Sequence, residues 1–170
     1  MDNGYRQKKP LTKQIGEYLV AAELCRRGLI ATTFTGNVPD FDIIATNDNF
    51  ETIPIQVKTI WKGGWQLDAK KFIIIGIDNG VQRVIDKISL SNHDLVCIFV
   101  RLASQGDDEF YIFRLKDLQE IIFEDYSQYL AKHNGMRPKN DNSTHVGINL
   151  RLLERFKDNW GIILNQKSTT

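Results

Sequence analysis

Three polar residues could form a catalytic site: Asp42, Gln56 and Lys58. They lie in two short segments rich in β-forming residues, 41–46 and 52–60. A carboxylate and an amide oxygen are hard ligands of the kind that Mg²⁺ prefers. A lysine ammonium beside them could stabilise the negative charge that develops at a phosphate. This combination suits the hydrolysis of a phosphodiester bond.

The alternation of side chains along a strand indicates how these groups could meet. Residues 47–49, Asn-Asp-Asn, are typical of a turn, so we expect the two segments to form a hairpin. With Ile43 opposite Ile55, Asp42 lies opposite Gln56, and Lys58 shares the face of Gln56. A shift of one residue would mix the polar side chains with an apolar face, which burial disfavours. We therefore expect Asp42, Gln56 and Lys58 to converge.

A fourth polar residue, Glu17, comes from a helix predicted over residues 11–27, which ends before Gly28. At about 100° per residue, Glu17 lies inside an apolar arc between Leu24 and Ala21, whereas Glu23 lies on the polar side. A carboxylate that faces a sheet needs a cation, a metal or Lys58 as partner. The apolar face of this helix is expected to consist of Leu11, Ile15, Tyr18, Ala22 and Cys25, with Leu19 at its margin.

The four residues together predict a metal site. Asp42 could bind Mg²⁺, or Mn²⁺ in its place, with the Gln56 side-chain oxygen and the Val57 carbonyl as further ligands and Glu17 completing the shell through water. The metal would polarise the phosphate and help to generate hydroxide, and Lys58 would stabilise charge or position the water. The alternative is a solvated hairpin face with an ordinary ion pair.

The order of these residues resembles that of the PD-(D/E)xK nuclease superfamily. The segments GEYLVAAELCRRG, FDIIA and IQVKT are similar to those of bacterial homing endonucleases with a Q-x-K site and of Holliday junction resolvases, over residues 12 to 60. The resemblance implies an α/β fold with a restriction-endonuclease-like αβββαβ core, in which helices flank a mixed central sheet. It also implies Mg²⁺-dependent cleavage of DNA by a homodimer. The superfamily motif would select Asp40, but the strand pattern favours Asp42.

The rest of the chain predicts one domain over residues 1–170, and its 42% hydrophobic residues suffice for a core. Residues 1–10 are expected to be flexible, residues 134–147 to form a long polar loop that is mobile or functional, and residues 148–170 to form a helix and tail. Residues 81–88 fit a strand or a helix equally. Further elements are expected as follows: a turn at 35–37, strands at 29–34, 65–67 and 72–77, a hairpin of 95–102 with 109–115, and helices at 116–132 and 150–160.

Composition limits the classes of function. The net charge of +1 excludes a strongly basic nucleic-acid coat, so DNA binding must come from local patches. No apolar run approaches the ~20 residues of a membrane span, and no signal peptide is recognisable, so we expect a cytoplasmic protein. The two cysteines, Cys25 and Cys97, have apolar neighbours and are expected to be buried, reduced thiols.

The candidate DNA contacts are lysines of the densest basic cluster, near the N-terminus, two further lysines at 70–71, and basic or aromatic residues beside Gly63-Gly64, where we expect a tight turn. They are Lys8, Lys9, Lys13, Lys62, Trp65, Lys70 and Lys71. The alternatives are a solvated charge run for the lysines and, for Trp61 and Trp65, packing across a hairpin. Two other functions stay open, a DNA-binding module too weak in metal binding to cleave and a protein-interaction domain that kept only the scaffold.

Overall fold

The chain folds into two compact units, each assembled from separate segments. The structure, a computed structural model, describes residues 9–34, 39–104 and 106–165. The first unit contains Met1–Gly63, Leu95–Arg114 and Leu153–Thr170, and the second contains Gly64–Asp94 and Leu115–Leu152. The predicted turn at 35–37 and the candidate Lys8 lie outside the described residues.

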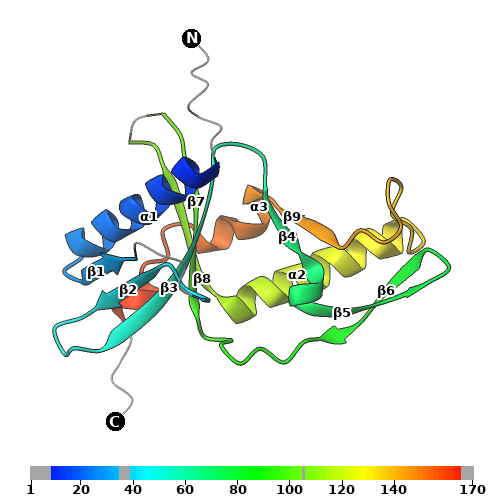
Figure 1. Cartoon of the computed structure of the whole chain (residues 1–170), viewed down its shortest axis with the longest axis horizontal. Coiled ribbons are helices and arrows are strands. Elements are labelled where there is room, and N and C mark those ends of the chain that lie inside the picture. The colour runs from blue at the N-terminus through cyan, green and yellow to red at the C-terminus, as the bar shows by residue number, and fades with distance from the viewer. Residues whose placement is uncertain (1–8, 35–38, 105, 166–170) are drawn as a thin grey trace. The chain divides into compact units, whose positions relative to one another are not determined.

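A five-stranded mixed sheet is the centre of the first unit (Figure 1). Its order is β1-β2-β3-β7-β8, with β3 and β7 parallel and the other neighbours antiparallel. The strand bounds are β1 Ile30–Thr33, β2 Ile43–Thr46, β3 Thr52–Ile60, β7 Val96–Arg101 and β8 Glu109–Arg114. The predicted α/β class, a mixed sheet flanked by helices, is confirmed.

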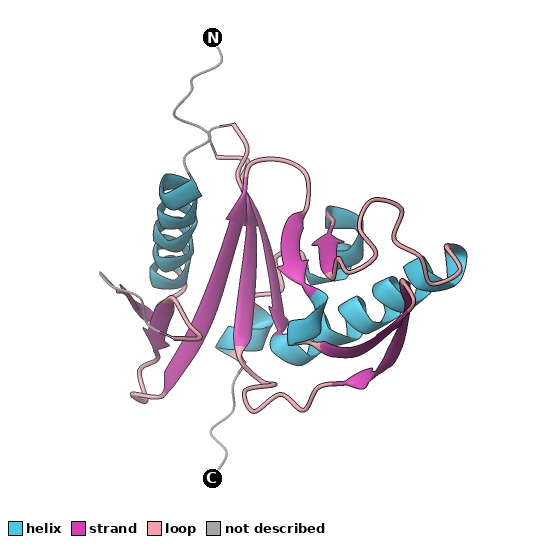
Figure 2. Ribbon diagram, turned by 45° about the vertical axis from the view of Figure 1, so that its right-hand side comes forward, coloured by secondary structure: helices cyan, strands magenta, loops and turns pink. Residues whose placement is uncertain are grey.

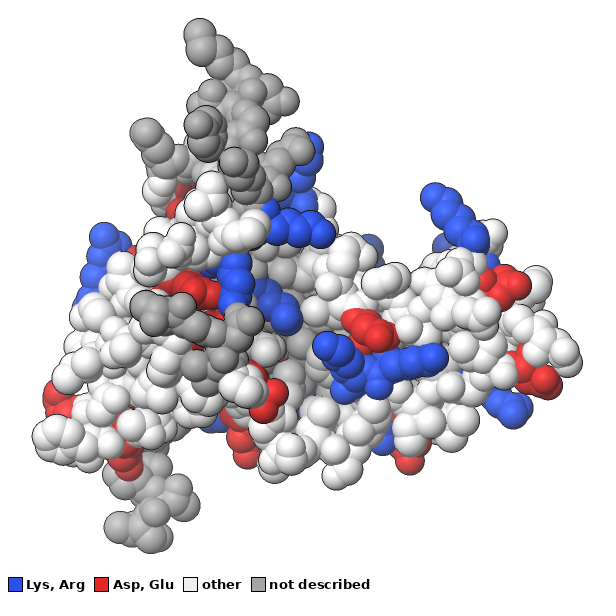
Figure 3. All heavy atoms as spheres, in the orientation of Figure 1, with Lys and Arg blue, Asp and Glu red and all other residues white. Residues whose placement is uncertain are grey.

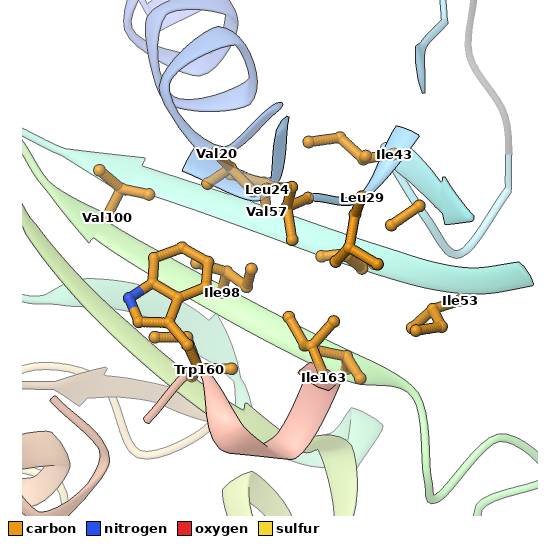
Figure 4. Close-up of a cluster of buried hydrophobic side chains, with 14 of the residues drawn as sticks. Val20, Leu24, Leu29, Ile43, Ile53, Val57, Ile98, Val100, Trp160 and Ile163 are labelled. Carbon is orange, nitrogen blue, oxygen red and sulfur yellow. The ribbon is translucent and has the colours of Figure 1, made fainter. Parts of the chain in front are cut away.

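Helix α1 (Lys9–Arg26) covers one face of this sheet (Figure 2). Val20 and Leu24 of α1 are fully buried against alternate residues of the strands, such as Val57 and Ile98. The short helix α4 (Gly161–Leu164) and Trp160 before it complete the same core (Figure 4). The guanidinium of Arg27 lies 4.0 Å from the centre of the Trp160 ring, which joins the end of α1 to this segment. No helix in the described part of the chain has the length and apolar character of a membrane span.

The buried face of α1 differs from the predicted one. Gly16, Val20 and Leu24 are its buried residues, whereas Leu11, Ile15 and Tyr18 are 41%, 39% and 56% exposed. Ala22 and Cys25 are exposed as well, so the expectation of a buried Cys25 thiol was wrong, while Cys97 is buried as expected. The prediction chose the side of α1 with most apolar residues. It failed because α1 approaches the sheet through Gly16, whose missing side chain permits closer contact than leucine or tyrosine would.

The second unit consists of α2 (Leu115–Lys132), a hairpin of β5 (Ile73–Asp78) with β6 (Val81–Lys87), and the pair β4 (Trp65–Asp68) and β9 (His145–Ile148). The 3₁₀ turn η2 (Ala69–Lys71) joins β4 to β5. Buried Gln119 of α2 donates to the carbonyl oxygens of Phe72 and Ile88, at 2.8 and 2.6 Å. Buried Gln82 of β6 donates to the carbonyl oxygen of Ser143 at 3.1 Å, and the polar loop after α2 is therefore anchored.

Three details differ from the predicted elements. Strand β4 pairs with β9, so Gly63-Gly64 does not connect two paired strands. The chain from β3 to β7 runs through β4, η2, β5 and β6, and the second long helix follows β8. The predicted helix at 150–160 is broken into α3 (Leu150–Leu153) and the 3₁₀ turn η3 (Glu154–Phe156), because Lys157 turns to an extended conformation and bridges Tyr111 of β8.

Glu109 at the start of β8 binds three neighbours. Its carboxylate accepts hydrogen bonds from Arg101 and Tyr111 and contacts Lys157 Nζ at 2.9 Å. The hydrogen bond from Arg101 is the main reason why the pKa of Glu109 is lowered from 4.5 to about 2. Burial, followed by the hydrogen bond to Glu109, raises the pKa of Tyr111.

Replacing Glu109 with glutamine should therefore destabilise the protein in a pH-dependent way. The ionised carboxylate stabilises the fold fully above about pH 4.5, and this contribution is lost as the pH falls toward about 2. We expect E109Q to lower the free energy of unfolding by about 2 kcal/mol at neutral pH and to unfold like the wild type near pH 2. Urea unfolding across this pH range measures the effect, with exposed Glu124→Gln as control. An equal loss at every pH would contradict it.

Candidate metal and active site

The ammonium group of Lys13 lies between two carboxylates at one end of the β2–β3 pair. Its Nζ is 3.0 Å from Asp42 Oδ1 and 3.2 Å from Glu17 Oε1. The two acidic side chains are only 15% and 12% exposed, whereas that of Lys13 is 57% exposed. Two partly buried negative charges therefore share one cation that is open to solvent.

Glu17 reaches this position because its helix lies very close to β3. A Cβ atom placed on Gly16 would lie 1.8 Å from Thr59 Oγ1 and 2.8 Å from Thr59 Cβ, a space that no side chain could share. Glu17 follows Gly16 and lies one turn before Ala21, at the margin of the buried stripe. Its Oε1 atom is buried, and the Lys13 ammonium 3.2 Å away is its charged partner.

Asp42 lies immediately before β2, where the regular pairing with β3 begins. Ile43 pairs with Ile55, as predicted, and the Asn47 side-chain oxygen accepts from the backbone N–H groups of Asn49 and Glu51 in the turn. The Asp42 N–H donates to the Ile55 carbonyl oxygen at 2.8 Å. The Asp42 Oδ2 atom accepts the N–H of Val57, also at 2.8 Å. Oδ2 of Asp42 thus accepts a backbone hydrogen bond of β3 that a carbonyl oxygen of a neighbouring strand would otherwise accept, and Oδ1 faces Lys13.

Gln56 and Lys58 flank Val57 on β3. They alternate with the buried Ile55 and Val57, so they lie on the face opposite to the one that packs under α1. The Gln56 amide nitrogen donates to the carbonyl oxygen of Asp40, 3.3 Å away, which leaves its amide oxygen as an acceptor. Asp40 itself is exposed and has a positive φ of 71°. Asp42, and not Asp40, therefore contributes the carboxylate to the Lys13 cluster, which consists of Lys13, Glu17 and Asp42.

The donor set fits a hard divalent ion. Asp42 Oδ1 and the buried Glu17 Oε1 already contact one cation, the Lys13 ammonium. The carbonyl of Val57 points to the β2 side, since the N–H and C=O of a strand residue point the same way and this N–H binds Asp42. Within the described residues there is no cluster of three or more His, Cys, Asp or Glu side chains. A metal here would need neutral oxygens and water besides the two carboxylates.

The electrostatics of the cluster favour a charged lysine. The hydrogen bond to Asp42 is the largest influence on the pKa of Lys13, and it raises that pKa although partial burial lowers it. The negative charges of Asp42 and Glu17 raise it further. Lys13 is therefore a permanent positive charge at the site around neutral pH.

The lysines predicted to contact DNA are exposed where the structure describes them. They are Lys9, Lys13 and Lys62 in the first unit and Lys70 and Lys71 in the second. Trp65 is only 2% exposed, so it packs inside the second unit, and its predicted contact with bases is not supported. Figure 3 shows basic side chains scattered over the drawn face with acidic ones among them. The net charge of +1 agrees with this mixed surface.

Comparison with solved structures adds an independent observation. The chain is similar in fold to a homing endonuclease. That protein, the bacterial homing endonuclease I-Ssp6803I, matches at a TM-score of 0.50 and 12% identity, over 93% of this chain and 94% of the other. No protein family model matches the chain, and the curated proteins gave no significant match. The likeness is one of fold, and the side-chain arrangement described above is a separate observation on this chain.

Sequence reasoning missed two residues of this site. Lys13 was predicted to contact DNA, yet in the structure it pairs with Glu17 and Asp42. The spacing of four residues between Lys13 and Glu17 on a helix was the available signal. Gly16 carried no signal of its own, because a glycine within a helix indicates a close contact only once the neighbouring strand is known.

The close approach of α1 to β3 predicts an unusual response to Gly16→Ala. Alanine normally stabilises a helix relative to glycine by about 1 kcal/mol. Here the new methyl group would collide with Thr59, so we expect the free energy of unfolding to fall by about 1 to 3 kcal/mol. Chemical denaturation measures this change. Ala22→Gly on the exposed face of α1 serves as the control for helix propensity, and a more stable G16A protein would disprove the close contact.

Proposed function

We propose that the protein is a Mg²⁺-dependent DNA endonuclease that hydrolyses phosphodiester bonds. The observation that carries this proposal is the meeting of Glu17 and Asp42 around one cation beside the Gln56-Val57-Lys58 segment. The similarity in fold to a homing endonuclease supports it. The residue order resembling the PD-(D/E)xK nucleases, noted in the sequence, agrees with the same function.

Each residue has a distinct role in this proposal. Glu17 and Asp42 would hold the magnesium ion, with the Val57 carbonyl as a neutral ligand. Gln56, on the other face of β3, would add its amide oxygen only if the ion lies beyond the end of β2, where Asp42 is the residue opposite Gln56. The bound ion would supply Lewis acidity toward the phosphate and a water of lowered pKa. The N–H of Val57 orients Asp42 by hydrogen bonding to Oδ2, which fixes the direction of Oδ1. Lys58 would donate to a phosphate oxygen and stabilise the negative charge that grows there.

DNA would bind through local basic residues. Exposed Lys9, Lys13 and Lys62 belong to the unit that contains the site, and Lys70 and Lys71 belong to the second unit. With a net charge of only +1, the affinity depends on a few phosphate contacts and should fall steeply with salt. A homodimer would place two such sites on one duplex, which is what cutting both strands requires.

A second function is favoured by one specific observation. Among the residues that the structure describes, the site has only two carboxylates, and the ammonium of Lys13 already offsets one of their two negative charges. A metal ion therefore gains less here than at a site with three acidic ligands. This favours a DNA-binding module of the same fold that binds metal too weakly to cleave.

Plasmid nicking tests the proposed activity. We expect wild-type protein with Mg²⁺ or Mn²⁺ to relax supercoiled plasmid, and Asp42→Asn, Glu17→Gln and Lys58→Met each to lower the rate at least about a hundredfold. Asp48→Asn, in the exposed β2–β3 turn, is the matched acidic control and should cut like the wild type. Circular dichroism verifies that each variant is folded. Equal nicking by all the variants would disprove the assigned roles.

Gln56→Glu separates the two candidate functions. The substitution adds a carboxylate next to the proposed ligands without changing the length of the side chain. If the wild type retains DNA but does not cut it, Q56E should strengthen Mn²⁺ binding and we expect cleavage to appear, because the added charge attracts the ion. Calorimetric titration with Mn²⁺ and the plasmid assay measure the two effects. Unchanged Mn²⁺ affinity would show that Gln56 does not face the ion.

A further inference from the structure

The Lys13 cluster contains the oxygen atoms that a metal ion would need. Asp42 Oδ2 already accepts the Val57 N–H, so Oδ1 is the carboxylate oxygen that remains for a metal. Lys13 Nζ lies 3.0 Å from this Oδ1. It also lies 3.2 Å from Glu17 Oε1, which is buried. The ammonium group and a divalent ion would compete for the same two atoms.

We propose that Lys13 competes with the divalent ion: its ammonium group partly neutralises Glu17 and Asp42 until the metal displaces it. This proposal rests on the proposed metal site. It assigns Lys13 a role apart from the four residues of that site, because Lys13 acts on metal affinity and touches neither the metal nor the reacting phosphate.

Exposure makes the displacement easy for the lysine. Its side chain is 57% exposed, so the ammonium group can leave the carboxylates and be solvated by water at little cost in free energy. The side chains of Glu17 and Asp42 are only 12% and 15% exposed. Leaving these partly buried carboxylates ionised without a positive partner would cost more free energy than moving the lysine into water. The cluster therefore has two stable arrangements, one with the lysine between the acids and one with a metal ion between them.

Displacement would also release a cation beside the proposed metal site. A Lys13 that leaves the carboxylates becomes available to an anionic DNA backbone. Metal binding and DNA binding would then strengthen each other, because a phosphate that attracts Lys13 leaves the two oxygens to the metal. The coupling is reciprocal and needs no movement of the backbone.

Titration with Mn²⁺ alone tests the proposal without relying on activity. Calorimetry and the electron paramagnetic resonance signal of free Mn²⁺ give the dissociation constant for wild type, Lys13→Gln, Lys13→Arg and Lys9→Gln. Lys9 is exposed and lies one turn earlier on α1, so K9Q measures the general effect of removing a positive charge. We expect K13Q to bind Mn²⁺ about five to ten times more tightly than wild type. K9Q should change the constant less than about twofold, and K13R should behave like the wild type.

Thermal unfolding distinguishes competition from a structural role. We expect K13Q without metal to melt below the wild type, because two carboxylates lose their partner, and Mn²⁺ to raise its melting temperature more than that of the wild type. A K13Q protein that stays less stable at saturating Mn²⁺, with unchanged Mn²⁺ affinity, would show that Lys13 is only structural. If wild type and K13Q bind equally and Glu17→Gln abolishes binding, the metal site stands and the competition is disproved. If no variant binds Mn²⁺, the proposed metal site fails together with this inference.

Discussion

Two carboxylates that meet at the end of two neighbouring strands need a positive charge between them, and Lys13 of α1 supplies it where α1 meets β2 and β3. Glu17 and Asp42 are mostly buried, and each would repel the other without Lys13. The contact joins α1 to the start of β2, beside the apolar packing of Val20 and Leu24. Because Gly16 has no side chain, α1 can approach β3 closely enough for this contact to form. Packing and electrostatics thus act at adjacent residues of one helix.

Much of the local structure followed from the sequence. The register of Ile43 with Ile55 was predictable because a hairpin with one apolar face allows only one alignment, and because Asn47 forms the expected turn. The inward direction of Glu17 was also predicted, from its place between Leu24 and Ala21, and Leu24 is fully buried. The angular position of Glu17 next to Leu24 on the helix correctly predicted its direction. The assumption that the side with most apolar residues is the buried side was wrong.

Contacts between distant segments were beyond the reach of sequence patterns. The pairing of β4 with β9 joins residues that are about eighty positions apart, and neither segment has a sequence pattern that predicts the strand with which it pairs. The break after Phe156 results from the bridge between Lys157 and Tyr111, a tertiary contact that overrides helical periodicity. The pairing of Lys13 with Asp42 has the same character, since it links a helix to a strand start 29 positions later.

The core of the first unit has a consequence for how the chain is made. Val20 and Leu24 of α1 pack in the same cluster as Trp160 and Ile163. A ribosome releases the former long before the latter, so the growing chain must keep apolar surfaces of α1 and the early strands exposed while the second unit is being synthesised. The apolar core beneath α1 is therefore completed only when residues 160–163 have been synthesised. A chaperone that shields apolar helices during translation would act in this interval.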